Sequence, residues 1–119
     1  MESESKEELA DRLVRQAPAL RTIYGDAGAC EVLASGIRVL ERVDMSTWSA
    51  RPALKVAAVA GLAAKLTQPC PDEPLVCKLW HKIAGRSAEE QVRKLDRELV
   101  CVWGRQGLVD SDYINDCLQ

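Results

Sequence analysis

Residues 52–66, Pro-Ala-Leu-Lys-Val-Ala-Ala-Val-Ala-Gly-Leu-Ala-Ala-Lys-Leu, form an almost wholly apolar segment that only Lys55 and Lys65 interrupt. Pro52 suits the first turn of a helix, where its missing N–H is not needed. A helix that is apolar nearly all round has to be enclosed by other elements. The sequence therefore predicts that Pro52–Leu66 is the central helix of an α-helical core.

The segments before this one also have helical periodicity. Within Ala29–Val43, apolar residues recur three and four positions apart, which is the spacing of a buried helix face. An earlier helix is expected over about Glu4–Leu20, and Pro18 should disturb its last turn. The stretch Gly25–Gly28 predicts a turn between these two helices, and a loop is expected over Asp44–Ser49.

Prolines, glycines and capping residues limit the helices that follow. Three prolines within residues 69–74 exclude regular helix there. A fourth helix is expected after this stretch, capped by Asp72, with Pro74 in its first turn and Gly85 ending it after Ala84. A capping box at Ser87–Glu90 predicts the start of a fifth helix over Ala88–Arg105, which Gly104 and Gly107 should end. A last short turn is expected from Asp110 to Ile114.

These elements predict an all-α protein that folds as a single compact bundle of about five helices. A chain of 119 residues is the size of one domain. We expect the bundle over residues 29–107, an extra N-terminal helix and turn over residues 1–28, and a short C-terminal tail over residues 108–119. The N-terminal segment either packs on the bundle or mediates self-association.

Composition excludes several classes of protein. Hydrophobic residues make up 47% of the chain, which is too many for a disordered protein. The net charge of −2 provides no strong positive field for non-specific nucleic-acid binding, so nucleic acid is not an expected partner. No apolar run approaches the roughly 18 residues of a membrane span, and the acidic start lacks the pattern of a secretory signal. We therefore expect an intracellular protein.

The cysteine and histidine content argues against metal and catalytic chemistry. The five cysteines are odd in number and lack the close pairs of structural zinc sites, so we interpret them as reduced thiols and expect no metal or cofactor. Cys77 and His81 are spaced for one helix face, but no orienting third group is evident nearby. The simpler interpretation packs Cys77 in the core and turns His81 to solvent. No enzymatic activity is expected.

The order of apolar residues in the last two helices resembles that of a known family. These residues are Val76, Trp80 and Ile83, followed after the linker 84–90 by Val92, Leu95, Leu99, Val100 and Trp103. The pattern is similar to the N-terminal domain of the elongation factor TFIIS, also called the LW domain, which occurs in Elongin A and in the integrase-binding domain of LEDGF. One inserted residue, Asp96 and the single base Arg105 are departures from the family pattern.

Weaker agreement extends the resemblance upstream, so that it covers about Cys30–Arg105. Leu62, Leu66 and Thr67 match the helix before the connection, and Val43-Asp44 resembles an Ile-Asp pair in the LEDGF loop. The proline-rich stretch Pro69–Pro74 departs from a segment that is helical in the family.

The resemblance implies a nuclear protein-interaction module that docks short disordered peptide motifs of transcription or chromatin factors. Two loops, 43–48 and 85–88, would frame the peptide pocket. The implied peptide-binding residues are Val43, Asp44, Trp48, Arg86 and Ala88. In this interpretation Val43 lines the pocket and Asp44 accepts hydrogen bonds from the partner's backbone.

Other interpretations of the same residues stay open. Asp44 also suits an ordinary turn or helix end. Trp48 is either an exposed anchor for a partner or a lid that folds back over the bundle. The mixed charges of residues 93–98 are interpreted as a solvated helix surface.

Three alternative functions are retained. The chain could be a helical regulatory protein, viral or host, that forms a homodimer and binds protein. It could instead bind double-stranded RNA as a dimer. The third alternative is a small enzyme that uses Cys77 and His81.

Overall fold

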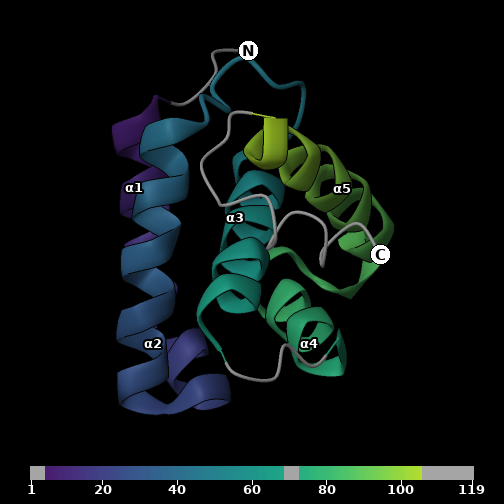
Figure 1. The fold of residues 1–119 in the computed structure, drawn as a ribbon. Helices are drawn as coiled ribbons and strands as arrows, with labels where there is room; N and C mark the ends of the chain where they lie inside the picture. Colours follow the sequence, from purple (N-terminus) through teal and green to yellow (C-terminus); the bar gives the residue numbers. More distant parts are fainter. Residues whose placement is uncertain (1–4, 69–72, 106–119) are drawn as a thin grey trace.

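The computed structural model describes residues 5–68 and 73–105, which form five α-helices and no strand (Figure 1). The elements are α1 (Lys6–Val14), α2 (Ala17–Arg42), α3 (Pro52–Thr67), α4 (Glu73–Ala84), the 3-10 turn η1 (Arg86–Ala88) and α5 (Glu89–Arg105). The predicted all-α bundle of about five helices is therefore confirmed. The predictions for Asp72, Gly107 and Asp110–Ile114 fall outside the described residues.

Helix α3 is the centre of the bundle, as its sequence predicts. Every residue from Leu54 to Ala64 is buried, including Lys55. Helix α3 contacts α1, α2, α4 and α5, and Figure 1 shows it between the α1–α2 pair and the α4–α5 pair. Trp80 and Trp103 are also buried, as expected, and they supply the aromatic volume of a core that has no Phe.

Two glycines let neighbouring helices approach closely. A Cβ atom on Gly61 of α3 would lie 2.6 Å from Nε1 of Trp80 on α4. A Cβ atom on Gly36 of α2 would lie 2.6 Å from Cδ2 of Leu13 on α1. Real Cβ atoms do not approach other heavy atoms so closely, so a side chain at residue 61 would require the Trp80 ring to move, whereas one at residue 36 would displace only the end of the Leu13 side chain.

The N-terminal region differs from the sequence prediction. Helix α1 already ends at Val14, and α2 begins at Ala17 with Pro18 in its first turn. The proline therefore opens a second helix instead of disturbing the end of the first. Leu9 and Leu13 are fully buried in the common core, so α1 packs on the bundle.

The expected turn at Gly25–Gly28 is a bend within one long element. Gly25 has φ of +78°, and the residues after it are helical, so helix resumes at Asp26 and not at Ala29. A positive φ is readily adopted by glycine, which explains why the bend lies at this residue.

The connection from α4 to α5 agrees with the prediction in part. Gly85 has φ of +92° and ends α4 after Ala84, as expected. Ser87 lies inside η1, and α5 begins at Glu89, one residue later than predicted. Gly104 lies within α5 and does not end it.

Substitution of Gly61 tests the approach of α4 to α3. Gly61→Ala should lower the free energy of unfolding by about 1–3 kcal/mol, because the added methyl group overlaps the Trp80 indole. Urea denaturation measures the change. In a Trp80→Leu background, the same substitution should be neutral or stabilise the protein by up to about 1 kcal/mol through helix propensity. Equal destabilisation in both backgrounds would contradict the proposed contact.

Candidate functional site

An open depression of about 820 Å³ lies between α5 and the segment that joins α2 to α3. We call it the α5 groove. Helix α5 contributes Gln91, Lys94, Leu95, Arg97, Glu98, Cys101, Val102 and Arg105, and the other wall consists of Trp48, Ser49, Ala50 and Leu54. From Gln91 to Arg105 the groove follows α5 over about 21 Å, at a rise of about 1.5 Å per residue.

The α5 residues of the groove fall almost entirely on one stripe of the helix. With the exception of Arg97, they recur three or four positions apart from Gln91 to Arg105. The core stripe of the same helix contains Val92, Leu95, Leu99 and Trp103, and of these only Leu95 also lines the groove. Helix α5 therefore packs on the bundle with one face and borders an open groove with another.

Trp48 combines features of both interpretations made from the sequence. Its side chain is half-buried and packs against the hydrophobic core, and it also lines the α5 groove. Local backbone hydrogen bonds hold the residue in place: Trp48 N donates to Met45 O at 3.1 Å, and Ala50 N donates to Trp48 O at 3.0 Å. The indole is thus a fixed apolar surface at the edge of the groove.

Two of the other predicted site residues are in the core. Val43 is only 1% exposed and Ala88 only 2% exposed, so neither side chain offers a surface to a partner. Each instead anchors its loop to the bundle. A Val43→Glu substitution would consequently test folding more than binding, because it buries a charge.

Asp44 is exposed and forms a local turn. Its Oδ1 accepts hydrogen bonds from Ser46 N at 3.0 Å and from Ser46 Oγ at 2.6 Å. These hydrogen bonds lower the pKa of Asp44 below its ordinary value of 3.8. The arrangement matches the interpretation of Asp44 as a turn residue.

The two loops of the expected pocket lie apart. The segment after α2 is beside the C-terminal end of α5, whereas η1 leads into its N-terminal end (Figure 1). Arg86 lines a second depression of about 560 Å³, together with His81, Ser87, Glu89, Glu90 and Gln91. Because Gln91 lines both depressions, Trp48 and Arg86 border adjoining surfaces instead of one common pocket.

A cluster of polar side chains links α4 to α5. Nε2 of His81 lies 2.6 Å from Oε1 of Glu89, and Oε2 of Glu89 lies 3.6 Å from Nη2 of Arg93. Arg93 also donates to Sγ of Cys77 at 3.4 Å. Glu89 is the acidic partner of His81 that sequence reasoning missed, because the pairing depends on how η1 turns the chain back.

This cluster does not join the thiol to the imidazole. The described residues show no hydrogen bond between Cys77 and His81, so no direct proton path connects a nucleophile to a base. Within the described part of the chain, no group of His, Cys, Asp and Glu side chains is arranged to hold a metal ion. The contacts of the cluster hold the first turns of α5 against α4.

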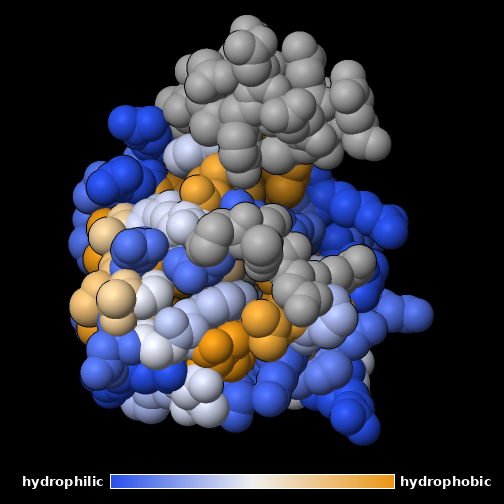
Figure 2. Space-filling view, turned by 60° about the horizontal axis from the view of Figure 1, so that its bottom comes forward, coloured by the Kyte–Doolittle hydropathy of each residue, from blue (hydrophilic) through white to orange (hydrophobic). Residues whose placement is uncertain are grey.

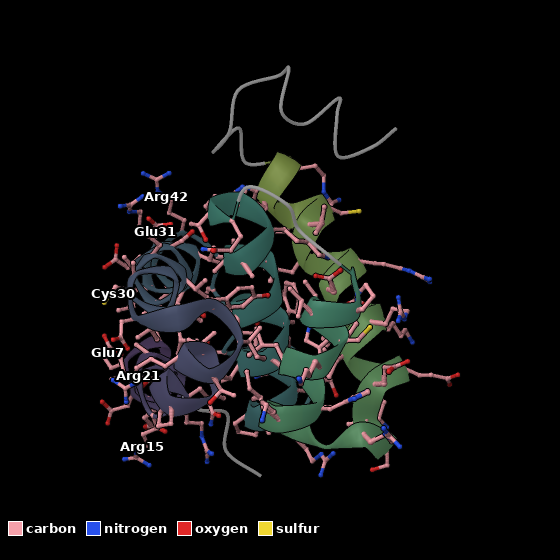
Figure 3. The ribbon with its side chains drawn as sticks, turned by 90° about the horizontal axis from the view of Figure 1, so that it is seen from below. Glu7, Arg15, Arg21, Cys30, Glu31 and Arg42 are labelled. Carbon is pink, nitrogen blue, oxygen red and sulfur yellow. The ribbon has the colours of Figure 1, made fainter. Side chains whose placement is uncertain are left out.

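The outer face of α1 and α2 carries charges of both signs. Glu7, Arg15, Arg21, Glu31 and Arg42 point away from the body of the protein (Figure 3). On the face in Figure 2, hydrophobic residues form separate small patches among charged ones. Among the described helices, none is long and apolar enough to span a membrane. Of the two depressions described, the α5 groove has the larger share of apolar surface, so it is the candidate site.

Comparisons with known proteins identify no family or relative for this chain. No protein-family model matches the chain, and neither a characterised protein nor a solved structure matches it. The likeness to TFIIS N-terminal domains therefore rests on the pattern of residues alone.

The His81–Glu89 contact predicts a pH-dependent contribution to stability. The hydrogen bond to His81 is the main reason that the pKa of Glu89 lies below its ordinary value of 4.5. A lowered carboxylate pKa stabilises the fold above the pKa of the unfolded state, and this stabilisation is lost as the pH falls through the folded-state pKa. Glu89→Gln should therefore lower the Tm at about pH 6 and have a smaller effect at about pH 3.

Thermal denaturation monitored by circular dichroism measures both values. Glu90→Gln is the matched control, because it removes a charge from the same first turn of α5 but keeps the His81 hydrogen bond. The prediction fails when Glu90→Gln and Glu89→Gln lower the Tm equally at about pH 6.

Proposed function

We propose that this protein is an interaction module that docks short disordered motifs of transcription or chromatin factors in the nucleus, in the manner of the TFIIS N-terminal domains it resembles. The observation that carries the proposal is the α5 groove, which has the half-buried Trp48 on its edge. Partly buried aromatic residues beside a concave apolar surface are typical anchors of protein interfaces.

The shape of the groove favours a peptide over a small molecule. The groove is open along its length and follows a single helix for about 21 Å. Its partly exposed apolar residues are Trp48 and Ala50 on one wall and Val102 on the other. A segment that folds on binding uses a few apolar anchors of this kind, and it gains modest affinity because ordering the segment costs entropy.

The residues predicted from the resemblance take different parts in this proposal. Trp48 contacts the partner directly, and Arg86 lies beyond the adjoining end of the groove. Val43 and Ala88 hold the two connections against the core, and Asp44 stabilises the turn that precedes Trp48. The recognition surface is consequently the face of a helix instead of two neighbouring loops.

A pair of exposed cysteines provides a matched test. Cys101 lies in the α5 groove, and Cys30 lies on the outer face of α2 (Figure 3). Cys101→Trp should fill the groove without entering the core, whereas Cys30→Trp adds the same side chain elsewhere. Peptides of about 16 residues, long enough to cross the groove, are selected on the wild type from a random phage-displayed library.

Fluorescence anisotropy then gives the affinity of each selected peptide for the three proteins. We expect Cys101→Trp to weaken binding by at least about tenfold and Cys30→Trp to leave it unchanged. The absence of any selected peptide, or an equal response to both substitutions, would refute the proposal. Sedimentation of the wild type alone would show whether a second copy of the chain covers the groove instead.

A further inference from the structure

The charges along the α5 groove are mainly positive. Lys94, Arg97 and Arg105 border it, and Glu98 is the one acidic residue that lines it. The complete chain has a net charge of −2, so the groove is locally opposite in sign to the protein as a whole. A surface of this kind attracts acidic segments and repels basic ones.

These charges are not used within the protein. In the described part of the chain, Lys94, Arg97 and Glu98 form no ion pair or side-chain hydrogen bond. Lys94 and Glu98 are spaced for an intrahelical pair, yet they are not joined. Arg105 only donates from Nε to its own helix, at Cys101 O. The cations therefore remain available to an external carboxylate.

The spacing of the apolar residues indicates a helical occupant. Leu95, which is only 8% exposed, and the partly buried Val102 are seven residues apart, which places them about 10 Å apart along α5. A second helix that lies alongside α5 presents apolar residues at the same interval, in positions i and i+7. An extended chain repeats its side chains on one face every two residues and matches this interval less well.

We propose that the α5 groove takes an acidic amphipathic helix of a partner protein. The partner helix packs its apolar side chains on Trp48 and Val102, and carboxylates on its flanks face Lys94, Arg97 and Arg105. The inference rests on the proposed function and specifies the chemical class of the docked segment. An RNA strand also offers phosphates to the cations and bases to Trp48, but the net charge of −2 disfavours a polyanion as the partner, so RNA is an alternative outcome of the test.

Three synthetic peptides with the same apolar residues test the charge preference. Their flanking positions are all Glu, all Gln or all Lys, and their affinities for the wild type are measured by fluorescence anisotropy. The Glu peptide should bind at least about tenfold more tightly than the Lys peptide, with a difference that decreases at high salt. The circular dichroism of the bound Glu peptide should show helix.

A charge-reversed pair of variants provides the control. The double variant Lys94→Glu/Arg97→Glu should weaken binding of the Glu peptide by about tenfold and strengthen binding of the Lys peptide. The double variant Lys78→Glu/Lys82→Glu changes the net charge of the protein by the same amount as Lys94→Glu/Arg97→Glu, but on an exposed part of α4. It should leave the affinities for the Glu and Lys peptides unchanged.

The outcomes separate this inference from the proposed function. Suppose that the Gln or Lys peptide binds the wild type as tightly as the Glu peptide and loses this affinity in the Cys101→Trp variant. The groove then docks peptides, and the acidic class is wrong. If poly(U) RNA binds and loses affinity in Lys94→Glu/Arg97→Glu while no peptide binds, both the acidic helix and the peptide-docking function are overturned.

Discussion

Helix α4 can lie against the central helix α3 only because a glycine of α3 stands where the two helices cross. The contact between Gly61 and the Trp80 indole shows this constraint most directly, since even a methyl group at residue 61 would overlap Nε1. The large side chain of the pair comes from α4 and the space for it comes from α3. Because α4 lies this close, the linker that follows it and the start of α5 are also held against the bundle. The position of α5, which forms one wall of the groove, therefore depends on the packing of Trp80 on α4 against Gly61 on α3.

Polar groups between α3, α4 and α5 fix the orientation of these helices. Nζ of Lys65 lies 2.7 Å from Oδ2 of Asp96, and this pair joins α3 to α5. Asp96 is mostly buried, and its Oδ1 has no hydrogen-bond partner, so the contact includes a desolvation cost. Lys65 and Arg93 also lie over the Trp80 ring, at 5.9 and 5.4 Å from its centroid. Such a pair adds little net stability, but any rotation of α5 would leave the carboxylate buried without its cation. The pair consequently holds the groove-lining stripe of α5 toward solvent.

The sequence predicted features that depend on local pattern and missed those that depend on packing. The central position of α3 follows from its composition, and the end of α4 follows from Gly85. The same local rules were ambiguous for Pro18, because a proline suits both the place where one helix is interrupted and the first turn of the next. Asp96 was interpreted as part of a solvated surface, yet it is buried beside Lys65, 31 residues earlier in the chain. Neither this pairing nor the partner of His81 can be derived without knowing how the helices cross.

The separation of the two predicted loops has a simple geometric origin. In a regular antiparallel bundle with helices of equal length, the connections after α2 and after α4 meet at the same end. Helix α4 does not run back along the whole of α3 and lies beside the end of α3 that is remote from the α2–α3 connection (Figure 1). Helix α5 follows α4 and runs toward the segment that contains Trp48 (Figure 1). The surface between the two connections is therefore the length of α5 itself. A partner that contacts both ends has to follow this helix, and this requirement favours a motif that lies along α5 over one that is held between two loops.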